Sequence, residues 1–207
     1  IERVMRLHGS LGLFRSYGEN MDIYMGSLLA GENAEAPSPF DFALGGRGTS
    51  PILPLGASGK KIKAGQTIMV DMAGNYTPWM TDMTRVFSVG KTLDIAYHAH
   101  QVSIDIHNHI MDMAKPGVSC AELYNLSMET VKKHNLEPYF MGTKQQAKFV
   151  GHGVGLEINE PPVLTPRSKE ILEPNIVFAL EPKFVIPEIG AVGIENTYLI
   201  TQDGIEK

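Results

Sequence analysis

Three apolar runs of this sequence each contain an acidic residue, and this feature constrains the fold most strongly. Asp71 lies within residues 68–73, Glu181 ends the run 177–181, and Glu195 ends the run 191–195. A buried carboxylate without a partner costs several kcal/mol. The runs contain no obvious Lys or Arg that could compensate each carboxylate. We therefore expect the folded chain to bring a bound cation to these residues.

Glycine and proline divide the chain into the elements of a mixed fold. Residues 1–36 have no clear pattern, after which we expect strands at 39–44, 67–73 and 84–89, the last two forming a hairpin. Helices follow at 93–114 and 121–134, and Ser119 with Glu122 forms a capping box at the start of the second. Strands return at 147–150, 176–185 and 191–201. Strands on both sides of a helical middle predict an α+β fold.

Composition excludes several classes of protein. The 207 residues carry a formal charge of −5, which argues against nucleic acid as a partner, and no apolar stretch is long enough to span a membrane. The single Cys120 cannot form an internal disulfide, which fits a reducing compartment, so the cytoplasm is the expected location. The thiol of Cys120 is expected to be inert. Residues 1–207 are expected to form one catalytic domain. The start at Ile1 suggests a further domain upstream.

A fourth acid and a histidine extend the group of expected metal ligands. Asp82 follows Asp71 by eleven residues across the hairpin turn, a spacing that allows paired strands to bring both carboxylates together. His152 lies in a Gly-His-Gly-Val-Gly segment that permits close approach of the backbone. Four carboxylates and one imidazole suit two divalent cations such as Mn²⁺, Co²⁺, Fe²⁺ or Zn²⁺. From spacing alone, solvated acids at strand ends and a loop histidine remain the alternative.

Four segments in order resemble the pita-bread metallopeptidase superfamily of prolidase, aminopeptidase P, methionine aminopeptidase and creatinase. The segments are Asp71 with Asp82-Met83-Thr84-Arg85, then 151–156 with Glu160-Pro161-Pro162, then Leu180-Glu181-Pro182, and finally Gly193-Ile194-Glu195-Asn196. Together they cover about residues 38–201. The resemblance implies a curved antiparallel sheet with helices on its outside.

The resemblance also implies a metal site and an activity. Its metal ligands map to Asp71, Asp82, His152, Glu181 and Glu195, with Asp82 and Glu195 bridging two ions, Mn favoured. Glu181 is also expected to move the proton of the attacking water. The implied activity is that of an Xaa-Pro dipeptidase or aminopeptidase, which removes the first residue of small peptides through a metal-activated bridging water. A homodimer is possible, and retention of all five ligands argues against a metal-free, creatinase-like site.

Two positions depart from the resemblance. Leu55 and Asn159 stand where these peptidases usually carry histidines, and Asn159 can donate a hydrogen bond but cannot exchange a proton near neutral pH. Two alternatives therefore stay open: a non-peptide hydrolase or lyase acting on a small amide or carboxylate metabolite, and a binding module with weak or no catalysis. The histidines at 98, 100, 107 and 109 are expected to lie on the surface of a helix rather than to bind metal.

Overall fold

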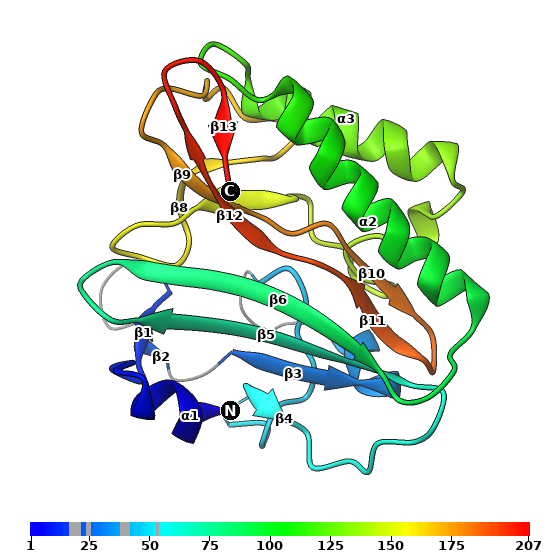
Figure 1. Cartoon of the computed structure of the whole chain (residues 1–207). Coiled ribbons are helices and arrows are strands. Elements are labelled where there is room, and N and C mark those ends of the chain that lie inside the picture. The colour runs from blue at the N-terminus through cyan, green and yellow to red at the C-terminus, as the bar shows by residue number, and fades with distance from the viewer. Residues whose placement is uncertain (17–21, 24–25, 38–41, 53) are drawn as a thin grey trace.

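The computed structural model describes residues 1–16, 22–23, 26–37, 42–52 and 54–207. Two larger sheets form its centre (Figure 1). The first has the order β4-β3-β5-β6, with strands Gly56–Ala57, Ser27–Ala30, Thr67–Asn75 and Met80–Ser88. The second has the order β13-β12-β9-β7-β8, with strands Ile205–Glu206, Asn196–Ile200, Val177–Leu180, Gly151–Gly153 and Glu160–Val163.

Two further strand pairs and the helices complete the fold. The strand pairs are β10 with β11, Lys183–Ile186 with Gly190–Gly193, and β1 with β2, Phe14–Arg15 with Asp22–Ile23. The α-helices are α1 Glu2–Leu7, α2 Asp94–Met113 and α3 Cys120–Lys133, and the 3₁₀ helices are η1 Gly31–Glu35 and η2 Glu137–Tyr139. Pairings are antiparallel apart from β3 with β4, which are parallel. No helix within the described residues is both long enough and apolar enough to cross a bilayer.

Helices α2 and α3 form the outer layer on one side of the molecule (Figure 1). Helix α2 packs on α3, β10 and β11, and it buries Ala99, Val102, Ile106 and Ile110 at the spacing of one helical face. The expected capping box begins α3, since Glu122 N–H donates to Ser119 Oγ and Ser119 N–H donates to the Glu122 carboxylate. Both predicted helices are thus confirmed to within a residue or so at each end.

The predicted hairpin is also present, as β5 and β6, and both strands are longer than expected. Other strand predictions were wrong. The expected strands 176–185 and 191–201 are each broken, after Leu180 and after Gly193, and each supplies a strand to the β10–β11 pair before or after joining the five-stranded sheet. The breaks have local causes: Pro182 has no N–H to donate, and Gly193 has φ of 126°, which other residues rarely adopt.

Two more expected strands do not form. Residues 42–44 are irregular, and 39–41 lie outside the described residues. Residues 147–150 belong to a loop, in which the N–H of Ala147 donates to the carbonyl of Met141, so the strand begins only at Gly151.

Candidate metal centre

The hairpin supplies the first two carboxylates. Asp71 in β5 lies opposite Thr84 in β6, and Ala73 lies opposite Asp82. Asp71 and Asp82 are therefore diagonal neighbours on one face of the hairpin, as the eleven-residue spacing predicted. Asp82 is buried, whereas the side chain of Asp71 keeps 21% of its surface exposed.

The two strand breaks supply the glutamates. Leu180 pairs with Asn196, and Lys183 pairs with Gly193, so Glu181 and Glu195 occupy facing breaks between the two sets of strands. An isolated bridge between Thr84 and Glu195 joins this region to the hairpin. Thr84 Oγ1 donates to Glu195 Oε2 at 2.6 Å. The breaks release Glu181 and Glu195 from strand alternation and bring both carboxylates to the face of β5 and β6.

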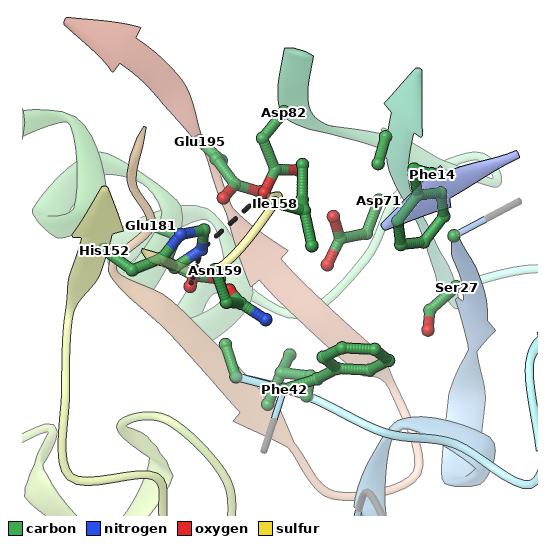
Figure 2. A pocket seen from close by; sticks show the side chains of 14 residues that line it. Phe14, Ser27, Phe42, Asp71, Asp82, His152, Ile158, Asn159, Glu181 and Glu195 are labelled. Atoms are coloured by element: carbon green, nitrogen blue, oxygen red, sulfur yellow. Dashed lines mark ion pairs between the residues drawn. The ribbon is translucent and has the colours of Figure 1, made fainter. Parts of the chain in front are cut away.

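His152 completes the group from strand β7. Its Nδ1 lies 3.1 Å from the backbone oxygen of Gly153, which fixes Nδ1 as a donor. Its Nε2 then faces the acids, 3.6 Å from Asp82 Oδ2 and 3.3 Å from Glu181 Oε1 (Figure 2). A backbone acceptor that orients one ring nitrogen and leaves the other directed at carboxylates is typical of metal-binding histidines. All five residues predicted as metal ligands thus converge, although their roles as ligands remain predictions.

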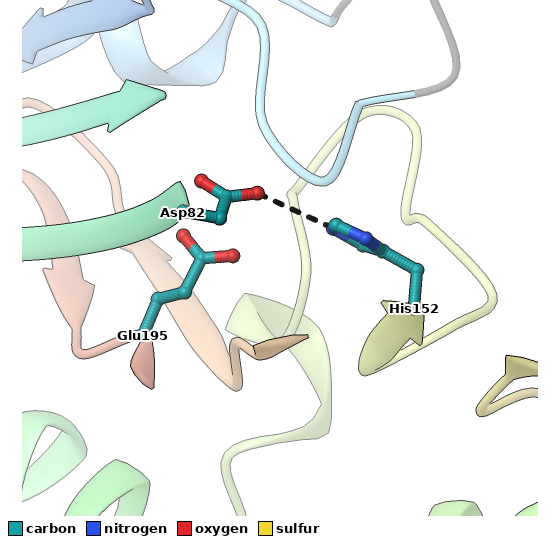
Figure 3. A group of neighbouring side chains, drawn as sticks. All are labelled: Asp82, His152 and Glu195. Carbon is teal, nitrogen blue, oxygen red and sulfur yellow. Dashed lines mark ion pairs between the residues drawn. The ribbon is translucent and has the colours of Figure 1, made fainter. Parts of the chain in front are cut away.

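The donor set on one side of this group fits a divalent cation. Ligand atoms of Asp82, His152 and Glu195 all lie within 4.8 Å of one another (Figure 3). Among the described residues, Glu195 Oε1 is a buried oxygen without a hydrogen-bond partner, so this oxygen is available to an ion. Two carboxylates and one imidazole suit Mn²⁺, Fe²⁺, Co²⁺ or Zn²⁺.

The pKa values of the acids also favour a bound cation at this group. Burial, followed by repulsion from the neighbouring carboxylates, raises the pKa of Asp82 well above its usual range. Burial also raises the pKa of Glu195 to about 8, against the opposing effect of Lys183. Both shifts mean that the site without an ion disfavours the ionised form of these two carboxyl groups, and a bound cation would offset this effect.

Lys183 corrects the expectation that the acids have no basic partner. It is fully buried, and its Nζ lies 2.8 Å from Asp71 Oδ2, 2.6 Å from Glu181 Oε2 and 3.1 Å from Glu195 Oε2. The sequence did contain a signal, because residues two apart in an extended chain point to the same side and Lys183 follows Glu181 by two. Although burial opposes it, the Lys183 ammonium together with His152 lowers the pKa of Glu181 to about 2.

A cavity adjoins the acids, and only one of the two departing positions lies on it. Its lining includes Asn159 and the apolar side chains of Phe14, Phe42 and Ile158 (Figure 2). Leu55 is buried and is not one of the lining residues found in the described part of the chain. Asn159 therefore changes the chemistry of the cavity relative to a histidine at that position, whereas Leu55 does not.

Sequence reasoning gave no role to Arg85. Its guanidinium donates to the backbone oxygen of Glu195 at 2.8 Å and to Asn196 Oδ1 at 2.9 Å, and thus ties β6 to the break that carries Glu195. The Thr-Arg pair that follows Asp82-Met83 was the available signal, because both side chains hold Glu195.

The prediction that the helical histidines lie on the surface was wrong for His107. Its side chain is buried, with Nδ1 2.8 Å from Tyr198 Oη and Nε2 3.1 Å from the backbone oxygen of Ile194. The histidines form no metal cluster among the described residues. Cys120 is buried as well, and burial raises the pKa of its thiol to about 11, in agreement with an inert thiol.

The sequence pattern of metallopeptidase family M24 matches residues 6–202. This chain belongs to that family. An Xaa-Pro dipeptidase of Pyrococcus furiosus is 32% identical over 181 residues, which are 87% of this chain and 50% of the relative. The chain thus spans about half the length of this M24 relative.

Two solved structures of aminopeptidases share the fold of this chain. The X-Pro aminopeptidase of Thermotoga maritima superposes with a TM-score of 0.78 at 23% identity, over 99% of this chain and 49% of that one. The methionine aminopeptidase of the same organism gives 0.69 at 22% identity, over 99% of this chain and 80% of that one. The α+β pita-bread fold expected from the sequence is therefore confirmed.

Proposed function

We propose that this M24 chain is the catalytic domain of a metal-dependent hydrolase of the Xaa-Pro dipeptidase or aminopeptidase type, which removes the first residue of small peptides. The observation that carries the proposal is the convergence of buried Asp82, His152 and Glu195 beside a cavity. A divalent ion held by these residues would polarise the peptide carbonyl and lower the pKa of water at the site. The name of the Pyrococcus relative supports peptides as the substrate class.

The chain's own residues then have separate tasks. Glu181 is ionised at neutral pH, and its Oε1 faces His152 while Oε2 is held by Lys183. Asn159 can donate its amide hydrogen to a substrate carbonyl in the cavity. Phe14, Phe42 and Ile158 provide apolar contacts that suit a proline ring or an apolar side chain.

A panel of Xaa-Pro and Xaa-Ala dipeptides and tripeptides, incubated with Mn²⁺, Co²⁺ or Zn²⁺, tests the proposal. We expect turnover that EDTA abolishes and that Asp82→Ala lowers by at least about 100-fold, since even residues that merely support a metal ligand contribute 10- to 100-fold. Asp112→Ala is the matched control, because Asp112 is an exposed acid on α2. Equal turnover by wild type and Asp82→Ala would place the activity elsewhere.

One observation favours a second candidate, a hydrolase or lyase acting on a small amide or carboxylate metabolite. Asn159 places a side chain that cannot exchange protons where family peptidases usually carry a histidine. Asn159→His should raise peptide turnover if the lost imidazole limits a peptidase. Because Leu55 does not line the cavity, Leu55→His should add nothing and serves as the control. No gain from Asn159→His, together with metal-dependent turnover of a small amide, would favour the second candidate.

Finer features remain proposals from the sequence. Manganese is the favoured metal and the cytoplasm the favoured location, and a homodimer is proposed as one assembly to test. One catalytic domain over residues 1–207 is likewise proposed. The sequence predicted two ions, and the position of Lys183 bears directly on that number.

A further inference from the structure

Lys183 is an ammonium group at the centre of the acidic cluster. Lys183 is the first residue of β10, directly after the break that carries Glu181 and Pro182, and it is fully buried. Its Nζ contacts one oxygen each of Asp71, Glu181 and Glu195, at 2.8, 2.6 and 3.1 Å. A lysine ammonium has three N–H donors, so these three carboxylates satisfy it completely.

The charge of Lys183 is stable in this setting. Burial alone would favour a neutral amine, but Nζ lies within hydrogen-bond distance of three carboxylate oxygens, which favour the charged form. A lysine that is buried and charged, with all its donors engaged, is a fixed part of the site rather than a side chain that swings in from solvent.

The position of Nζ coincides with one of the two places where the described residues could hold an ion. Those two groups are Asp82, His152 and Glu195 on one side, and Asp71, Glu181 and Glu195 on the other. The second group consists of the same three carboxylates that surround the Lys183 ammonium. An ion bound to all three would lie where Nζ lies, and two cations cannot share that place.

We infer that this chain binds a single divalent ion, at Asp82, His152 and Glu195, and that the Lys183 ammonium takes the place of a second ion between Asp71, Glu181 and Glu195. The first group remains free for an ion, because Glu195 uses Oε2 for Thr84 and Lys183 and leaves Oε1 unpartnered among the described residues. The inference concerns the number of ions and does not depend on whether the substrate is a peptide.

Charge balance agrees with a single ion. Four ionised carboxylates contribute −4, Lys183 contributes +1 and one divalent ion contributes +2, which leaves −1 in a buried site next to His152. A second divalent ion would leave +1 and would place a divalent charge against the ammonium. Like charges in contact in a site of low dielectric repel strongly.

Metal counting tests the inference without any substrate. The full chain is stripped of metal and titrated with Mn²⁺ by calorimetry, and the bound metal is counted by elemental analysis after dialysis. We expect one ion per wild-type chain, with the electron paramagnetic resonance spectrum of an isolated Mn²⁺. Lys183→Met keeps the length of the side chain but removes its charge, so this variant should bind two ions and show the spectrum of an exchange-coupled pair. Lys169→Met is the matched control, because Lys169 is exposed, and it should bind one.

A second variant tests the inference even if Lys183→Met does not fold. Asp71 contacts Lys183 and belongs only to the group that the ammonium occupies. Asp71→Asn should therefore leave the count at one ion per chain. Two ions in wild type, falling to one in Asp71→Asn, would overturn the inference. Because the readout is metal content, this failure would be distinct from a failure to cleave peptides.

Discussion

At the scale of single residues, Thr84 controls the carboxylate that both sides of the site share. It is fully buried, and its hydroxyl donates to Glu195 Oε2 at 2.6 Å. This bond holds Glu195 through Oε2 and leaves Oε1 without a hydrogen-bond partner among the described residues. Residues that hold metal ligands in place typically contribute 10- to 100-fold to metal affinity.

Thr84→Val should therefore weaken Mn²⁺ binding by roughly 10- to 100-fold, because valine keeps the shape of threonine but loses the hydroxyl. The measurement is a calorimetric titration of the metal-stripped chain. Thr81→Val is the control, since the Thr81 hydroxyl donates to the backbone oxygen of Gly74 in the same hairpin rather than to a carboxylate of the site. Equal affinities for the two variants would mean that Thr84 does not position Glu195.

The candidate ligands could be predicted from the sequence, whereas their basic partner was missed. Acidic residues inside apolar runs are visible in a single segment, and the same holds for a histidine among glycines. Lys183 contacts Asp71 across 112 residues of chain and Glu195 across a strand pair, and neither contact leaves a local pattern. The pairing of Glu181 with Lys183 was readable, but a single ion pair two residues apart did not reveal that the lysine serves three acids.

At the scale of elements, the break after β11 depends on the backbone of Gly193. Its φ is 126°, and a Cβ added there would lie 2.5 Å from the backbone oxygen of Pro182. Any other residue therefore meets both backbone strain and a clash with main chain that cannot move aside.

Gly193→Ala should lower the free energy of unfolding by about 3 kcal/mol, which corresponds to a fall of roughly 10 °C in Tm for a domain of this size. Thermal unfolding followed by circular dichroism measures the effect. Gly204→Ala provides the comparison, because no atom lies within 4 Å of a Cβ at that position, and its Tm should change little. A Gly193→Ala variant as stable as Gly204→Ala would show that the strand break tolerates a side chain.

Elements whose signals are local were predicted best. Helices α2 and α3 have an apolar face and, for α3, a capping box, and the two strands of the hairpin β5–β6 flank a short bend at residues 76–79. The broken strands are expected to be continuous from the sequence because apolar residues resume within three residues of Glu181 and of Glu195. Which sheet each half joins depends on partners far along the chain, and the sequence pattern of one strand does not contain that information.

At the scale of the whole molecule, His107 couples the outer helix α2 to the second sheet. Burial lowers the pKa of His107 to about 4, below its ordinary value of 6.5. The neutral ring accepts from Tyr198 Oη at Nδ1 and donates to the backbone oxygen of Ile194 from Nε2. A depressed histidine pKa means that the unfolded chain binds the proton more tightly, so His107 contributes stability that is present above pH 6.5 and is lost as the pH falls to 4.

The lowered pKa of His107 predicts that the free energy of unfolding falls by up to about 3 kcal/mol between pH 6.5 and pH 4. His107→Gln keeps an N–H donor and cannot be charged, so it should remove this part of the pH dependence. Urea unfolding at several pH values between 4 and 7 measures the difference between wild type and variant, in which the contributions of the other groups cancel. His98→Gln is the control, because His98 is exposed, and it should follow wild type. A wild type that loses no more stability than His107→Gln would contradict the role of this residue.

Metal binding should stabilise the whole chain, and the effect should depend on pH. A ligand at 100 times its Kd adds about 2.7 kcal/mol to the free energy of unfolding, or roughly 5 to 10 °C in Tm at this chain length. Asp82 and Glu195 must lose their protons to bind an ion, and the pKa of Glu195 lies at about 8 without one. The gain in Tm on adding Mn²⁺ at a fixed concentration should therefore grow as the pH rises from 6 to 9, and shrink as the pH falls and protons compete with the ion.

Differential scanning calorimetry with and without EDTA measures this gain, and Asp82→Ala should show little of it at any pH. A gain that is the same at pH 6 and pH 9 would mean that these carboxyl groups are already ionised in the metal-free chain, and that Lys183 alone balances their charge.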